Sequence, residues 1–188
     1  MWYPLVMKMF ISIPIKKEMY PYIEKIQDTI ITSSSKGIKS RLDQMHITLA
    51  FMNEVNKKQA VDLIEYLYSI NLPSCTLECN HINTFIRPEG TLYYIEARKN
   101  DSLIHIQQEV RSGLTKLHIP FDQKMGPFHI TIARKVQILR EKLELDINSL
   151  PSMSIDFITL VESTLTQNGA IHIEKGKFPL LGKSSTLL

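Results

Sequence analysis

Two copies of one short pattern could do chemistry in this sequence: His46-x-Thr48 and His129-x-Thr131. Imidazoles titrate near neutral pH, so two of them that face one substrate can serve as general base and general acid. Threonine hydroxyls can donate hydrogen bonds to the oxygens of a phosphate group. The doubled pattern therefore predicts acid–base chemistry at a phosphate, with the histidines as catalytic residues and the threonines as phosphate-binding residues.

Strand alternation predicts which neighbours share a face with these groups. Residues two apart in a strand point to one side, so Ala50 and Ala133 should lie beside the histidines and leave room for a ligand. Phe51 should pack on the apolar side. Arg134, five residues after His129, would place a planar, positively charged guanidinium group beside the same phosphate. Strict alternation puts Arg134 on the opposite face, so it reaches the site only if the strand ends, twists or bulges there.

The elements that must position these groups occur twice. Each half reads as an apolar strand, an amphipathic helix and a second apolar strand that carries a motif. Strands are expected near residues 8–13, 45–52, 91–97 and 128–134, and in the tail near 153–165 and 170–178, where Asn168-Gly169 would form a hairpin turn. Helices are expected over 17–34, 57–70 and 101–118. The nearly equal spacing of the two halves indicates an internal duplication, and we expect one bilobal domain over residues 1–188.

The composition is that of a folded globular protein. The 188 residues are 44% apolar and 22% charged, which excludes a disordered chain. A net charge of +3 permits a polyanionic partner but does not require one. No apolar run reaches the length of a membrane span and no signal peptide is recognised, so we expect a cytoplasmic protein without a membrane partner.

Other residues carry weaker predictions. Cys75, Cys79 and His81 share a strand face, but residues four apart in a strand are too distant to hold one metal ion, so no metal site is expected. His172 lacks a threonine two residues later and is expected to be structural or exposed. Eight residues fit either RNA contact or ordinary packing and solvation: Tyr93, Tyr94, Lys8, Lys39, Arg41, Lys124, Arg134 and Lys135.

The doubled motif resembles that of the 2H phosphoesterase superfamily, and within it the RNA 2′,3′-cyclic phosphodiesterases, which are also called 2′-5′ RNA ligases. Four segments match in order and span most of residues 8–180: MKMFISIPI, MHITLAF, FHITIAR and LVESTLTQNG. Two details differ from the family pattern. Phe128 separates Pro127 from the second histidine, and Met52-Asn53 replaces the usual Leu-Gly. Neither difference removes a catalytic group, although both leave the substrate open.

The resemblance implies an α+β fold with two pseudo-symmetric lobes, each an antiparallel sheet backed by helices, and a central cleft between the motifs. It implies catalysis by His46 and His129, phosphate binding by Thr48, Thr131 and Arg134, and no metal or cofactor. The substrate would be RNA with a 2′,3′-cyclic phosphate end, which is opened to a 2′-phosphate end. The reverse reaction would join 2′-5′ ends. No obligate protein partner is inferred, and which histidine acts as base stays open.

Two other functions fit the same residues. The site would suit a phosphodiesterase for 2′-5′-linked oligonucleotides or for small cyclic nucleotides. A module that binds RNA ends without turnover is less favoured, because anion binding alone is better served by Arg and Lys than by paired histidines.

Overall fold

The computed structural model describes residues 6–139, 143, 145–147, 150–167 and 169–181, so Asn168 of the predicted turn lies outside the described residues. The strands are β1 (Met7–Pro14), β2 (Ser34–Lys39), β3 (His46–Val55), β4 (Cys75–Leu77), β5 (Cys79–Phe85), β6 (Thr91–Ala97), β7 (His129–Ile138), β8 (Met153–Ile155), β9 (Phe157–Thr166) and β10 (Gly169–Pro179). The α-helices are α1 (Tyr20–Thr32), α2 (Lys57–Ser69) and α3 (Asp101–Lys116), and short 3₁₀ turns are η1 (Lys17–Met19) and η2 (Leu42–Gln44).

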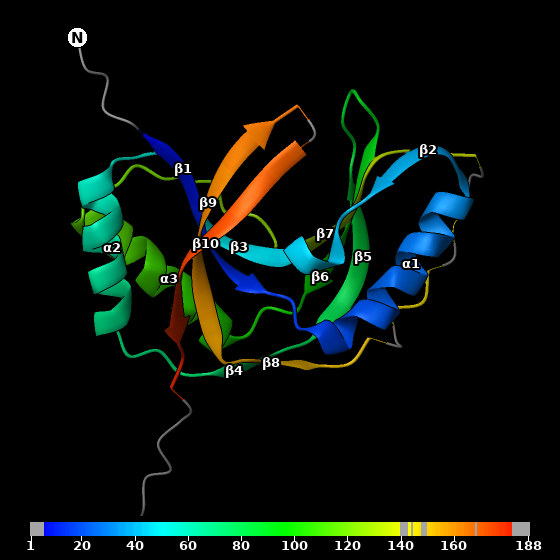
Figure 1. The fold of residues 1–188 in the computed structure, drawn as a ribbon. Helices are drawn as coiled ribbons and strands as arrows, with labels where there is room; N and C mark the ends of the chain where they lie inside the picture. Colours follow the sequence, from blue (N-terminus) through cyan, green and yellow to red (C-terminus); the bar gives the residue numbers. More distant parts are fainter. Residues whose placement is uncertain (1–5, 140–142, 144, 148–149, 168, 182–188) are drawn as a thin grey trace, which may run out of the picture.

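Most of the strands form one sheet in the order β10-β9-β1-β3-β7-β6-β5, with β2 paired to β7 (Figure 1). Neighbouring strands in this sheet are antiparallel. The two halves meet where β3 pairs with β7 through Ile47 and Ile130. The predicted α+β class with antiparallel strands is confirmed. The halves share one continuous sheet, because the two motif strands are neighbours.

Helices α1 and α3 each pack on the half of the sheet that is formed mainly by the other half of the sequence. Helix α1 follows β1 in the chain but packs on β2 and β7, whereas α3 follows β6 but packs on β3 and α2. Figure 1 shows α2 and α3 beside the part of the sheet with β1, β9 and β10, and α1 beside the part with β5 and β7. Each motif strand is therefore covered by a helix from the other half of the sequence.

The helices form where the predicted apolar stripes occur, and two of them begin at asparagine caps. The buried stripe residues are Ile23, Ile26 and Ile30 in α1, and Leu103, Ile106, Val110 and Leu114 in α3. The Asn56 side chain accepts a hydrogen bond from the Gln59 backbone N–H at 2.9 Å and so begins α2. Asn100 caps α3 in the same way through the Leu103 N–H at 2.8 Å.

Strand β2 was not predicted from the sequence, and the single strand expected over Cys75, Cys79 and His81 is divided into two strands. Strand β2 is an edge strand with the polar run SSKGIK, which lacks the apolar alternation by which strands are recognised. Strands β4 and β5 are adjacent in the chain but belong to different sheets, because β4 pairs with β8 and β5 pairs with β6. Within the described ranges, no helix has both the length and the apolar character needed to cross a membrane.

Candidate active site

The two His-x-Thr motifs lie side by side in the sheet. Ile47 of β3 and Ile130 of β7 pair in antiparallel register, and both side chains are fully buried. Because the strands run in opposite directions, the histidine of each motif lies next to the threonine of the other. Alternation turns these four side chains to the face opposite the isoleucines. We call this the motif face, and it is defined by His46, Thr48, His129 and Thr131.

The four motif side chains are half-buried and free to bind a ligand. Among the described residues, no group forms a hydrogen bond with the hydroxyl of Thr48 or of Thr131. The sheet thus presents two imidazoles and two hydroxyls on one face, as the spacing of the motifs predicts.

A β-bulge follows the threonine of the first motif. In β3 the register moves from Ser12 opposite Thr48 to Ile11 opposite Ala50, so Leu49 is an extra residue. An extra residue reverses the alternation of every side chain that follows it until the next irregularity.

The second motif has the same bulge at the same position. In β7 the register moves from Tyr94 opposite Thr131 to Tyr93 opposite Ala133, so Ile132 is the extra residue. The two motif strands therefore repeat not only a sequence pattern but also its local irregularity.

The bulges correct the predictions that assumed unbroken alternation. Ala50 and Ala133 face the core, at 3% and 0% exposure, instead of lying beside the histidines. Phe51 is on the motif face opposite Phe10, with the rings stacked at 6.4 Å between centroids, instead of on the apolar side. Arg134 occupies the corresponding position in the second motif strand, so the bulge brings it to the motif face.

Two buried glutamines hold the bulges from the crossing helices. Gln27 of α1 donates from Nε2 to the carbonyl oxygens of Ile132 at 2.7 Å and of Ser40 at 2.8 Å. Gln107 of α3 donates from Nε2 to the carbonyl oxygen of Leu49 at 3.2 Å. The Ile132 carbonyl also accepts from the Ser40 backbone N–H at 2.9 Å. A bulge residue is left unpaired in the ladder between its two strands, and a buried carbonyl without a partner is costly. Each helix therefore stabilises the bulge in the motif strand that it covers.

Both imidazoles are oriented in the same way. Nδ1 of His46 lies 2.7 Å from the carbonyl oxygen of Gln44, and Nδ1 of His129 lies 3.0 Å from that of Pro127. A carbonyl oxygen only accepts, so in the neutral ring Nδ1 carries the proton and Nε2 is the basic atom. No described residue forms a hydrogen bond with either Nε2. Each ring is thus held by one nitrogen and has the other ready for proton transfer.

Desolvation lowers the pKa of His46 to about 4. The hydrogen bond to Gln44 opposes this shift, and the charges of His172, Arg134 and His129 add to it. His46 is therefore neutral at pH 7, which is the form that accepts a proton.

His172 of β10, which the sequence predicts to be structural or exposed, lies beside His46 at the edge of the motif face. Its half-buried ring lies edge-on to that of His46, with centroids 5.6 Å apart, and edge-on to Phe10 at 5.0 Å. The sequence holds no signal for this residue, because β10 reaches the site only through the order β10-β9-β1-β3.

Aromatic rings also surround His129. The rings of Tyr94 and Phe85 lie edge-on to its imidazole, with centroids at 5.3 Å and 5.9 Å, and stack on each other at 4.4 Å. Tyr94 is only 5% exposed, which favours the packing interpretation for this tyrosine over base stacking. The half-buried ring of Phe85 has the Arg87 guanidinium over it at 5.7 Å.

The other candidates do not join the motif face. Cys75 lies in β4 and Cys79 and His81 lie in β5, and these strands belong to different sheets. In the part of the chain that the structure describes, no three His, Cys, Asp or Glu side chains are grouped so that they could hold a metal ion. Lys39 and Arg41 of the predicted basic rim form ion pairs with aspartates.

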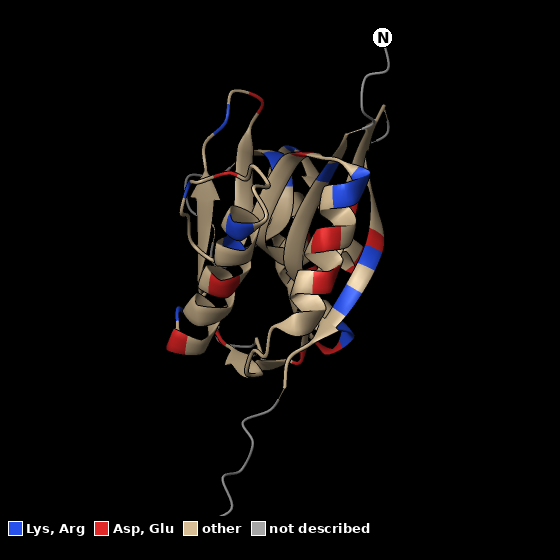
Figure 2. Cartoon of the chain, turned by 90° about the vertical axis from the view of Figure 1, so that its left-hand side faces the viewer, with Lys and Arg blue, Asp and Glu red and all other residues tan. Residues whose placement is uncertain are grey.

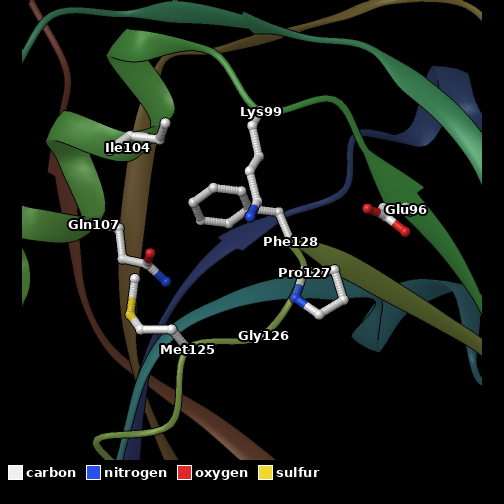
Figure 3. A pocket seen from close by; sticks show the side chains of 8 residues that line it. All are labelled: Glu96, Lys99, Ile104, Gln107, Met125, Gly126, Pro127 and Phe128. Carbon is white, nitrogen blue, oxygen red and sulfur yellow. The ribbon is translucent and has the colours of Figure 1, made fainter.

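Two cavities adjoin the strand that carries the second motif. One of about 520 Å³ lies where β7 begins and is lined by Glu96, Lys99, Ile104, Gln107, Met125, Gly126, Pro127 and Phe128 (Figure 3). The other, of about 470 Å³, is lined by Arg87, Pro88, Glu89, Gly90, Leu92, Arg134 and Lys135. The lining of the second cavity thus contains three cationic side chains and one carboxylate. By contrast, charges of both signs are interspersed on the face formed by α2 and α3 (Figure 2).

Comparison with known proteins gives relatives along most of the chain. A family profile described as "LigT like Phosphoesterase" matches residues 13–93, which include the first motif. An RNA 2′,3′-cyclic phosphodiesterase of Thermotoga maritima is 26% identical over 172 residues, covering 88% of this chain and 91% of the relative. One of Methanocaldococcus jannaschii is 26% identical over 174 residues, covering 88% of this chain and 96% of the relative.

Solved structures share the fold. The crystal structure of a Thermus thermophilus protein superposes with a TM-score of 0.80 at 18% identity, over 94% of this chain and 100% of that chain. The structure of E. coli LigT with 3′-AMP superposes with a TM-score of 0.75 at 19% identity, over 93% of this chain and 98% of that chain. The profile match and the curated relatives show that this chain is similar to LigT-like phosphoesterases and to RNA 2′,3′-cyclic phosphodiesterases.

Proposed function

We propose that this chain opens the 2′,3′-cyclic phosphate at an RNA end to a 2′-phosphate, with His46 and His129 as the proton-transfer pair. One observation carries the proposal: two basic Nε2 atoms share one face of the sheet with two threonine hydroxyls that have no hydrogen-bond partner in the described part of the chain. The curated relatives from two organisms are both named RNA 2′,3′-cyclic phosphodiesterase, which supports this choice of substrate.

The reaction needs one proton acceptor and one proton donor. Water attacks phosphorus while one imidazole takes its proton at Nε2, and the P–O3′ bond breaks as the other imidazole protonates the departing 3′ oxygen. Thr48, Thr131 and Arg134 would stabilise the charge on the two non-bridging oxygens. The cations of the second cavity, which adjoins Arg134, would bind the RNA backbone. When a 5′-OH takes the place of water, the same attack forms a 2′-5′ linkage.

We assign His46 as the base and His129 as the acid of hydrolysis. The pKa of about 4 keeps His46 unprotonated at pH 7, so kcat/KM should stay high below pH 6.5 and fall only as the pH passes through about 4. His172→Asn removes a charge that lowers this pKa, so the acid limb should move to higher pH. A pH–rate profile of both proteins checks the assignment, and an acid limb that stays in place in the variant would contradict it.

The proposed function is tested with short RNAs that end in a 2′,3′-cyclic phosphate, assayed in EDTA. The expected result is release of a 2′-phosphate end by the wild-type chain and not by His46→Ala. A panel with 2′-5′-linked oligonucleotides and mononucleoside cyclic phosphates separates the related phosphodiesterase activities. Tight binding of the cyclic end by wild-type protein with intact histidines, without turnover, would replace the enzyme with an RNA-end binding module.

A further inference from the structure

The cavity of about 520 Å³ at the start of β7 has no role in the proton transfers described above. We propose that it binds the base of the nucleoside that carries the cyclic phosphate and that it selects guanine. This inference rests on the proposed function, because that reaction is what brings an RNA end to the motif face.

The cavity shares walls with the site around His129. Glu96 is the cross-strand partner of His129, so both side chains point to the same face of the sheet. Pro127, another lining residue, supplies the carbonyl that holds Nδ1 of His129. A base is joined to its 2′,3′-cyclic phosphate by a single ribose. A phosphate between the two histidines therefore brings its own base to the neighbourhood of this cavity.

Three polar side chains line the cavity, and Figure 3 shows Glu96 on one side of Pro127 and Gln107 on the other, with Lys99 between them. Glu96 lies in β6, Lys99 in the connection that follows it and Gln107 in α3. The half-buried Glu96 carboxylate accepts a hydrogen bond at Oε2 from Asn83 Nδ2 at 2.7 Å, which fixes its orientation and leaves Oε1 and one lone pair of Oε2 as acceptors. Gln107 is 8% exposed and uses Nε2 for the Leu49 carbonyl, which leaves its amide oxygen as an acceptor. Within the described residues, Lys99 has no hydrogen-bond or ion-pair partner.

Glu96 does not serve as the carboxylate that orients His129. Nδ1 of His129 is already bonded to the Pro127 carbonyl, and Nε2 is the atom proposed for proton transfer. The Asn83 bond holds the Glu96 carboxylate independently of the imidazole. A fixed, half-buried carboxylate beside a reaction centre, with no cationic partner among the residues that the structure describes, is suited to accept hydrogen bonds from a ligand.

The chemistry of these groups matches guanine best among the four RNA bases. Guanine presents two adjacent donors, N1–H and N2–H, to one carboxylate and presents O6 as an acceptor to an ammonium group. Adenine and cytosine each offer one donor group on this edge, and uracil places two carbonyl oxygens around its single N–H, which a carboxylate repels. The apolar side chains of Ile104, Met125, Pro127 and Phe128 would border the flat base.

The test compares kcat/KM for four RNAs that differ only in the base bearing the cyclic phosphate, with wild type, Glu96→Gln and Lys99→Met. We expect wild type to prefer guanine, and Glu96→Gln to lower kcat/KM for the guanine substrate by roughly 10- to 100-fold, the worth of one bidentate base contact. The other three substrates should change little. Glu54→Gln and Lys57→Met are matched controls at exposed positions and should behave as wild type.

Two results would overturn the inference: equal rates for all four bases in wild type, or an equal loss for all four bases in Glu96→Gln. The second would mean that Glu96 acts through His129. A binding measurement distinguishes failure of this inference from failure of the proposed function. If wild type opens none of the four ends, the proposed function fails, and calorimetry with guanosine 2′-phosphate and uridine 2′-phosphate decides the base site. Guanosine 2′-phosphate should then bind more tightly and lose that advantage in Glu96→Gln.

Discussion

Replacing either His46 or His129 with alanine should lower kcat/KM for cyclic-phosphate RNA by about 10²–10⁴-fold, the usual contribution of one proton-transfer group. Each substitution leaves one imidazole on the motif face, so only half of the proton relay remains. The double variant should lose little more than the worse single variant, because groups that act as a unit are not additive. Initial rates in EDTA at pH 7 measure the loss.

His105→Ala is the matched control for these substitutions. His105 lies on an exposed side of α3, away from the motif strands, so its replacement should leave the rate within about twofold of wild type. A single His46→Ala or His129→Ala variant that keeps near-wild-type turnover while it stays folded by circular dichroism would contradict the two-histidine assignment.

Arg134→Gln should lower kcat/KM by about 10²–10³-fold, the range seen when one donor to a developing oxyanion is removed. Desolvation lowers the pKa of Arg134, yet a guanidinium stays protonated in proteins, so the positive charge is present throughout the pH range of the assay. Arg134→Lys should recover part of the activity, because it restores the charge but not the planar fork.

A second readout distinguishes a direct role of Arg134 from a structural one. The charge of Arg134 lowers the pKa of His46, so Arg134→Gln should also move the acid limb of the pH profile to higher pH. Arg98→Gln, which removes an exposed cation paired with Glu78, should change neither kcat/KM nor the pH of the acid limb. Full activity in Arg134→Gln would show that the phosphate does not use this residue.

Much of the fold was predictable because local patterns and tertiary packing agree. The apolar stripes of α1 and α3 and the capping asparagines place the helices close to their observed bounds. The motif strands were equally predictable from the sequence, because Ile47 and Ile130 alternate with His and Thr. By contrast, β2 is polar and pairs along only one edge, so its strand conformation depends on β7 and has no local signal.

The sequence by itself determined which chemical groups this protein carries, that they occur twice, and that histidine and threonine share a face within each motif. Alternation over two residues needs no information beyond the strand itself. Only the tertiary structure decided the direction of the side chains after each threonine. A bulge depends on the register of the neighbouring strand and on a carbonyl partner, and the partners, Gln27 and Gln107, come from helices of the opposite half.

The same physical reason explains why Phe51 and His172 lie where sequence reasoning did not place them, and why Arg134 meets the condition that its prediction required. Arg134 and Phe51 reach the motif face because one extra residue in each strand reverses the alternation. His172 reaches His46 because three strand pairings bring β10 across the sheet, although the two residues are far apart in the chain. Local spacing thus specifies the two His-x-Thr groups, and long-range pairing specifies the charged and aromatic groups around them.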